Sequence, residues 1–133
     1  MNALLSLLSQ PRWRGGWRLL LALLVLVISW LAFSPRPPVV LSTGWDKSNH
    51  MLAFFTLAFV MRLGFRGHWS LTALALLGYG VLIELVQSMV PGREADAMDV
   101  LADSLGLLPG LLLAMALQRV ARRRLAQPDL PGG

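Results

Sequence analysis

Long apolar segments constrain this chain more than any other feature. The first, residues 17–33, is almost entirely apolar, and a helix of about 20 such residues is long enough to cross a membrane. Hydrophobic residues make up 56% of the chain and charged residues only 14%, whereas soluble proteins average about 25% charged residues. A small soluble domain has too much surface to cover with so few charges. The sequence therefore predicts an all-α integral membrane protein.

Proline and glycine divide the chain into four predicted membrane-spanning helices. Three prolines between residues 34 and 43, and the Pro91-Gly92 pair, cannot continue a helix. The predicted helices are residues 17–33, 46–65, 70–90 and 97–118, which would form one four-helix transmembrane bundle over residues 17–118. Residues 1–16 would be a cytoplasmic or interfacial segment with a short surface helix, and residues 119–133 a basic cytoplasmic tail.

The first apolar segment could instead be a cleaved signal peptide. The small-residue site Ala32-Phe33-Ser34 is followed at once by Pro35, which is a poor context for cleavage. We therefore expect the first helix to be retained in the protein.

The basic residues predict an orientation for the bundle. If the N-terminus is cytoplasmic, nine of the twelve Lys and Arg residues lie on the cytoplasmic side, and only Arg36, Lys47 and Arg93 lie outside. This distribution follows the positive-inside rule and places both termini in the cytoplasm. The net charge is +5, but the basic residues lie beside apolar segments rather than along a groove. The lipid bilayer is therefore the expected partner, and no nucleic acid is expected.

Polar residues gather toward the outer ends of three of the predicted helices. Asp46 and His50 are four residues apart, as are Asp99 and Asp103, so each pair projects from one side of its helix. A carboxylate facing lipid costs at least about 2.5 kcal/mol, so these acids should face the bundle interior. The sequence predicts a polar pocket open to the extracytoplasmic side, with the ligand-binding candidates Asp46, Lys47, His50, Glu84, Gln87, Arg93, Asp99 and Asp103.

Several of these residues also have simpler interpretations. Asp46, and Asp96 or Asp99, could cap helices that start at the outer face. Lys47 and Arg93 could be structural counter-ions, and His50 could be a core residue. A divalent cation could offset the excess of carboxylates, although no established metal motif matches their spacing. The alternative is that one or more acids, Glu84 first, stay protonated.

The order of these residues resembles the VanZ-like proteins. The resemblance covers about half of the chain and rests on an ordered set: Asp46-Lys47, His50, Phe54, Glu84-x-x-Gln87, Pro91-Gly92-Arg93, Asp99, Gly106 and Gly110. One departure is Asp103, where many members carry Asn, and it adds a charge. The resemblance implies a small bacterial inner-membrane protein, in a family named for a protein linked to glycopeptide (teicoplanin) resistance.

Four functions fit this pattern. The first is the binding or modification of a cell-envelope or lipid-linked ligand, with Arg93, Lys47 and His50 contacting anionic groups while Glu84 and Asp99 position them or hold a cation. The second is a membrane hydrolase or transferase with His50 or Glu84 as general base, although the sequence contains no recognisable nucleophile constellation. The third is a homo-oligomeric proton-coupled transporter that uses Glu84. The fourth is a structural assembly factor whose polar cluster only locks the helices together.

Overall fold

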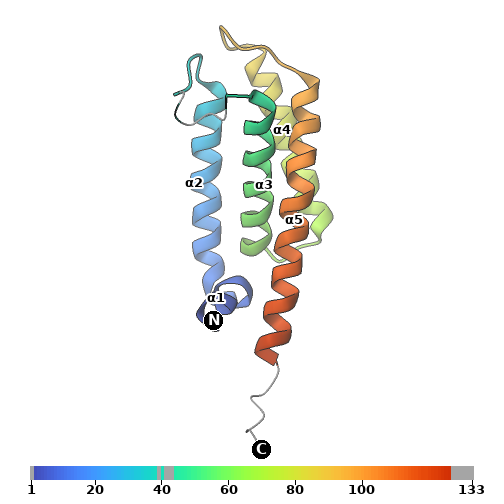
Figure 1. Cartoon of the computed structure of the whole chain (residues 1–133). Coiled ribbons are helices and arrows are strands. Elements are labelled where there is room, and N and C mark those ends of the chain that lie inside the picture. Colours follow the sequence, from blue (N-terminus) through green and yellow to red (C-terminus); the bar gives the residue numbers. More distant parts are fainter. Residues whose placement is uncertain (1, 39, 41–43, 127–133) are drawn as a thin grey trace, which may run out of the picture.

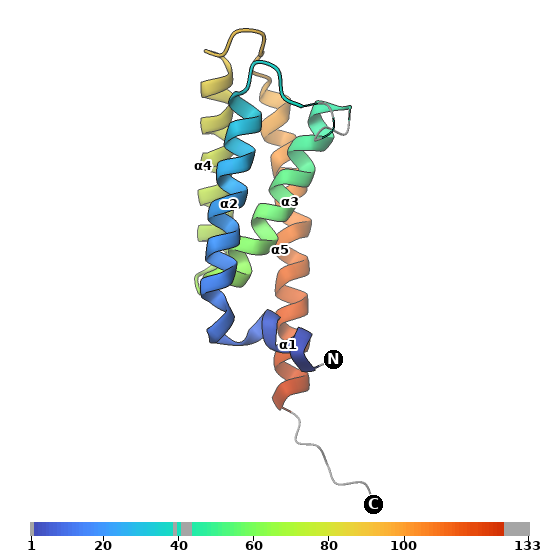
Figure 2. The same cartoon turned by 90° about the vertical axis from the view of Figure 1, so that its left-hand side faces the viewer.

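The protein is all-α in its computed structural model (Figures 1 and 2). The structure describes residues 2–38, 40 and 44–126. Its elements are α1 (Asn2–Ser9), the short 3₁₀ helix η1 (Pro11–Trp13), α2 (Arg14–Phe33), α3 (Asp46–Gly64), α4 (Trp69–Gln87) and α5 (Ala97–Ala126). Residues 127–133 of the predicted tail, which include Asp129, lie outside the described residues.

Most helix ends lie within a few residues of their predicted positions. α3 begins at Asp46 as expected, and α1 is the expected short N-terminal helix. α4 ends at Gln87 rather than at residue 90, because Ser88 and Met89 form a turn whose amides bond to the carbonyls of Glu84 and Val86. The chain thus leaves the helix just before Pro91-Gly92.

The largest error in the predicted boundaries is at the end of α5. We predicted an end at residue 118, but the helix continues to Ala126 through four arginines. Arginine has high helix propensity, and positive charge in the last turn is favourable at the negative end of the helix dipole. The basic residues after Gln118 therefore extend the last helix.

Helices α2 to α5 run side by side, with α3 in contact with the other three (Figures 1 and 2). α1 lies at the end of the molecule opposite the α2–α3 loop and packs against α5. Two hydrogen bonds fix this end: Trp17 Nε1 donates to the Leu7 carbonyl at 2.9 Å, and Arg18 Nε donates to the Gly64 carbonyl at 3.0 Å.

The closest helix contact is between α3 and α5, and it depends on two glycines. Gly106 and Gly110 are four residues apart, a spacing suited to close helix packing. A Cβ atom at Gly106 would overlap the backbone of Met51, and one at Gly110 would overlap the backbone of Phe55. The structure has the close packing that this spacing favours, and the two backbones are in direct contact.

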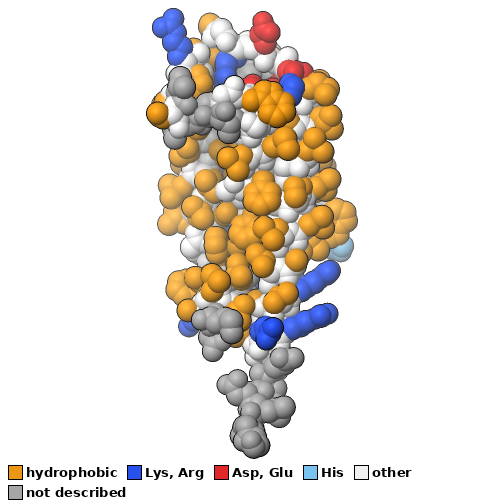
Figure 3. Space-filling view, in the orientation of Figure 1, with side chains coloured by type: hydrophobic (Ala, Val, Ile, Leu, Met, Phe, Trp, Pro, Cys, Tyr) orange, Lys and Arg blue, Asp and Glu red, His pale blue; other side chains and the backbone are white. Residues whose placement is uncertain are grey.

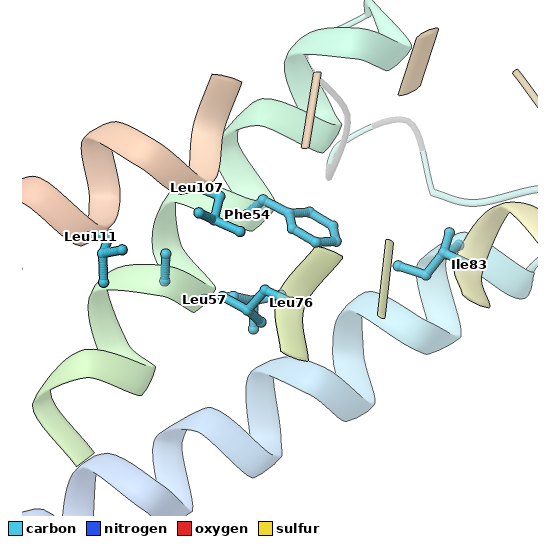
Figure 4. Close-up of a cluster of buried hydrophobic side chains, with 8 residues drawn as sticks. Phe54, Leu57, Leu76, Ile83, Leu107 and Leu111 are labelled. Atoms are coloured by element: carbon cyan, nitrogen blue, oxygen red, sulfur yellow. The ribbon is translucent and has the colours of Figure 1, made fainter. Parts of the chain in front are cut away.

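The apolar core lies between the helices (Figure 4). Phe54 and Leu57 from α3 pack with side chains from the neighbouring helices, and the Phe54 ring stacks 6.0 Å from the ring of Tyr79. The buried members of this cluster are Ala32, Phe54, Leu57, Ala58, Leu76, Ile83, Leu107 and Leu111.

The outer surface is strongly apolar, as a lipid-facing surface would be. In Figure 3 hydrophobic side chains cover the middle of the visible face, acidic side chains lie only at its upper end, and Lys and Arg lie at both ends. Within the described part of the chain, three helical segments are long and apolar enough to cross a membrane: Pro11–Phe33, Trp69–Gln87 and Ala97–Ala126. The predicted fourth span, α3, is not among them, because its first turns carry the polar run Asp46-Lys47-Ser48-Asn49-His50.

The glycine contact can be tested by a matched pair of substitutions. We expect Gly106→Ala to destabilise the protein by about 1–3 kcal/mol, because the new methyl group meets fixed backbone atoms. Gly78→Ala places the same group where no atom lies within 4 Å and should stabilise α4 by up to about 1 kcal/mol. Unfolding in mixed detergent measures both, and equal effects would contradict the close α3–α5 contact.

Candidate functional site

The imidazole of His50 on α3 is the point where polar groups from three helices meet. Its Nδ1 lies 2.8 Å from Asp103 Oδ1 on α5. Its Nε2 lies 3.8 Å from Asp99 Oδ2, also on α5, and 4.0 Å from Glu84 Oε1 on α4. All four residues are buried. The structure thus gathers four of the candidate residues around one ring.

Gly80 makes room for the most deeply buried of these acids. Asp103 is fully buried, and a Cβ atom at Gly80 on α4 would overlap its Oδ2. This Oδ2 accepts no hydrogen bond from the described part of the chain. The sequence analysis did not assign Gly80 a role, although its position one turn before Glu84 on the same helix was a possible signal.

Lys47 lies at the outer edge of the cluster, between two carboxylates. Its Nζ donates to Asp96 Oδ2 at 2.5 Å and to Asp99 Oδ1 at 3.1 Å. Asp96 also caps α5, since its Oδ1 accepts a hydrogen bond from the Met98 amide at 2.8 Å. Lys47 therefore joins the start of α3 to the start of α5 as the counter-ion of two acids.

Glu84 divides its two oxygens between the backbone and the site. Oε2 accepts a hydrogen bond from the Asp96 amide at 2.9 Å, which ties the end of α4 to the residue before α5. Oε1 is buried, has no hydrogen-bond partner among the described residues, and points toward His50. Oε1 of Glu84 is thus available to interact with a ligand bound beside the His50 imidazole.

Gln87 and Arg93 donate hydrogen bonds to the backbone at the end of α2. Gln87 Nε2 donates to the Ala32 carbonyl at 3.1 Å. Arg93 Nη2 donates to the carbonyls of Leu31 and Ala32 at 3.3 and 3.2 Å. These donors satisfy carbonyls that a helix end leaves unpaired, and the Arg93 charge is favourable at the negative end of the α2 dipole.

The electrostatics of the His50 ring require a proton or a cation near Nε2. If Nδ1 donates its proton to Asp103, a neutral ring presents the Nε2 lone pair to carboxylate oxygens of Asp99 and Glu84. Three electron-rich atoms would then face one another in a buried space, which is costly. A proton on Nε2, a proton on one carboxyl group, or a bound cation would each remove this repulsion.

A metal ion is one way to supply that charge. Asp46, His50 and Asp99 each offer one ligand atom, and these atoms lie within 4.8 Å of one another. The Nδ1 contact with Asp103 matches the carboxylate partner that orients metal-binding histidines. One imidazole and two carboxylates suit a divalent ion such as Zn²⁺ or Mn²⁺, so the residues present fit the divalent cation considered in the sequence analysis.

A cavity of about 760 Å³ adjoins the polar cluster and continues between α2 and α3. Its polar end includes His50, Gln87 and Arg93. Apolar side chains such as Ile28 and Ala53 form its wall along the two helices. Sequence analysis missed this apolar part, because nothing in the sequence shows which faces of α2 and α3 are adjacent.

The chain was compared with known protein families, curated proteins and solved structures. A model of the VanZ/LLP1 family matches residues 19–118. The matched region contains every candidate site residue and confirms the resemblance that their order suggested. No curated protein and no solved structure matches the chain significantly.

The Lys47–Asp96 contact predicts a pH dependence of stability. Hydrogen bonding to Lys47, followed by that to the Met98 amide, lowers the pKa of Asp96 below its ordinary value. A lowered pKa in the folded state stabilises the protein above the ordinary Asp pKa, and this stabilisation is lost as the pH falls through the folded-state value. Unfolding measured between pH 7 and pH 3 should show this loss.

The carboxylate responsible can be identified by substitution. Asp96→Asn should reduce the loss of stability in the acid range, whereas Glu94→Gln, which removes an exposed acid two residues earlier, should leave it unchanged. The effect should shrink at high salt, because Asp96 is half exposed. If both variants have the same pH profile as the unmodified protein, the Lys47–Asp96 pair does not contribute to stability.

Proposed function

The chain belongs to the VanZ/LLP1 family, and we propose that it binds a lipid-linked anionic ligand of the bacterial cell envelope. The ligand's chain would lie in the cavity between α2 and α3. Its charged head would lie at the polar end, beside His50 and Arg93. The observation that carries this proposal is the cavity itself, which is apolar along two helices and polar at one end.

The proposal includes a four-helix transmembrane bundle in the inner membrane with both termini in the cytoplasm. Although α3 is less apolar than the other helices, α2, α4 and α5 all pack against it, so little of its polar outer turn needs to face lipid. The arginines at the α1 end and the acids at the other end give the charge asymmetry of the positive-inside rule.

The shape of the cavity favours an amphipathic ligand. Its volume of about 760 Å³ lies within the range of about 300–1,000 Å³ that is typical of small-molecule sites. Leu24, Ile28 and Leu52 offer apolar contacts to a hydrocarbon chain. A water-soluble ligand would leave this wall unused.

Arg93 favours a negatively charged head group. Its donors reach only backbone carbonyls, and no carboxylate among the described residues pairs with it. Its positive charge therefore remains available at the cavity, where Gln87 adds an amide. A phosphate group is the anion that arginine binds well, and a cation at Asp46, His50 and Asp99 would add to this attraction.

The His50–Asp103 contact also supports modification of the bound ligand. A carboxylate on Nδ1 leaves Nε2 to act as a general base toward a water molecule. In this second candidate function the protein would hydrolyse a lipid phosphate or diphosphate. Loss of turnover in His50→Gln, with ligand binding retained, would distinguish hydrolysis from binding alone.

The unpaired Oε1 of Glu84 favours a third candidate, a proton-coupled transporter. A buried carboxylate with a free oxygen can carry a proton. One chain of this size would need a second copy to alternate its access between the two sides. Proton release on ligand addition that is absent in Glu84→Gln would support transport over simple binding.

The binding proposal can be tested by filling the cavity. We expect Ala53→Phe, on the cavity wall, to weaken binding of a polyprenyl diphosphate at least about tenfold, because the ring occupies the space of the chain. Ala75→Phe makes the same change on an exposed part of α4 and should leave binding unchanged. Native mass spectrometry of protein in nanodiscs measures the bound lipid.

A second variant tests the polar end separately. Arg93→Gln should weaken binding of the diphosphate while leaving binding of an uncharged polyprenol unchanged. If both Ala53→Phe and Ala75→Phe bind the diphosphate as well as the unmodified protein, the cavity is not its site. That result would favour a structural assembly factor over a lipid-binding protein.

A further inference from the structure

A second, basic cavity lies at the opposite end of the molecule from His50. Its volume is about 240 Å³, and it is bounded by the α1–η1 junction, the end of α3 and the last part of α5. Four arginines from separate parts of the chain line it: Arg14 from α2, Arg62 from α3, Arg66 from the following loop and Arg122 from α5. Folding thus collects four positive charges around one small space.

These charges have no acidic partner in the cavity. None of the described residues that line it is Asp or Glu. The charges of Arg66, Arg18 and Arg122 act on Arg14, and all have the same sign. Four unneutralised guanidinium groups repel one another, so an anion placed between them would stabilise this end of the fold.

Part of the cavity is held in a fixed geometry. Arg62 Nη1 donates to the Gly67 carbonyl at 3.1 Å, and Gln118 Nε2 donates to the Arg62 carbonyl at 3.3 Å. These contacts join the end of α3 to the loop and to α5. The side chains of Ser9 and Gln10 add neutral polar groups to the same wall.

We propose that this cavity is a phosphate-binding site. Arginine pairs with phosphate through parallel hydrogen bonds, and basic pockets between membrane helices bind the head groups of anionic lipids. The volume of about 240 Å³ is below that of drug-sized sites but suits a single phosphate group. The phosphate belongs either to a lipid head group or to a small soluble compound.

Positive charge at a membrane surface alone does not explain the arrangement. Arg119, Arg123 and Arg124 lie on the same stretch of α5 as Arg122, are exposed, and do not line the cavity. A general attraction to anionic lipid would depend equally on these residues. Binding inside the cavity would instead depend on the four arginines that line it: Arg14, Arg62, Arg66 and Arg122.

This difference provides a matched experiment. One variant carries Arg14→Gln, Arg66→Gln and Arg122→Gln, and the control carries Arg119→Gln, Arg123→Gln and Arg124→Gln, so both lose three charges. Each protein is placed in nanodiscs of phosphatidylcholine, with or without phosphatidic acid. In the discs without phosphatidic acid, inorganic phosphate is titrated at constant ionic strength, and thermal stability and native mass spectra are recorded.

We expect the control to bind phosphate or phosphatidic acid like the unmodified protein, and the cavity variant to bind at least about tenfold more weakly. Stabilisation by phosphate in phosphatidylcholine discs identifies a soluble ligand, and retention of phosphatidic acid alone identifies a lipid. If the triple variant does not fold, the single substitution Arg122→Gln, on the exposed part of α5, is measured instead. It should weaken phosphate or phosphatidic acid binding by a smaller factor. Equal loss in variant and control, or no binding by the unmodified protein, would overturn the proposal.

Discussion

The arrangement around His50 depends on the cost of a carboxylate in contact with lipid. Glu84, Asp99 and Asp103 lie on helices whose other faces are apolar, and each is expensive to expose to hydrocarbon. The structure turns all three toward His50, so one imidazole is shared by three acids. The α3, α4 and α5 helices are thereby fixed in rotation as well as in position, since turning any one of them would expose a buried carboxylate.

The glycine contact and the polar cluster are two parts of one interface. Gly106 meets the backbone of Met51, the residue after His50, and lies one turn after Asp103. The close approach of α3 and α5 at this point brings the Asp103 carboxylate within hydrogen-bond distance of the His50 ring. Gly80 on α4 leaves the space that Asp103 fills. Small residues on two helices therefore make the buried acid possible.

Much of this arrangement could be predicted from the sequence, because a helix in contact with lipid must be long and apolar and must keep its carboxylates away from the lipid. The helices were located from their apolar runs and from the prolines between them, and the pairs Asp46–His50 and Asp99–Asp103 follow from helical spacing. The roles of Arg93 and Gln87 at the end of α2 could not be predicted, since they depend on how far the loop after α4 reaches across the bundle. The apolar part of the first cavity and the whole of the second could not be predicted either, because they depend on which helix faces are adjacent, and the spacing of residues in the sequence does not contain that information.

The most direct test of the central claim is nitrogen-15 NMR of the His50 ring, with His68→Gln removing the only other histidine. We predict a protonated Nδ1 with a downfield proton signal from its bond to Asp103, and loss of that signal in Asp103→Asn. A ring protonated only at Nε2, with the same spectrum in Asp103→Asn, would contradict the account, because His50 would then not join α3 to α5.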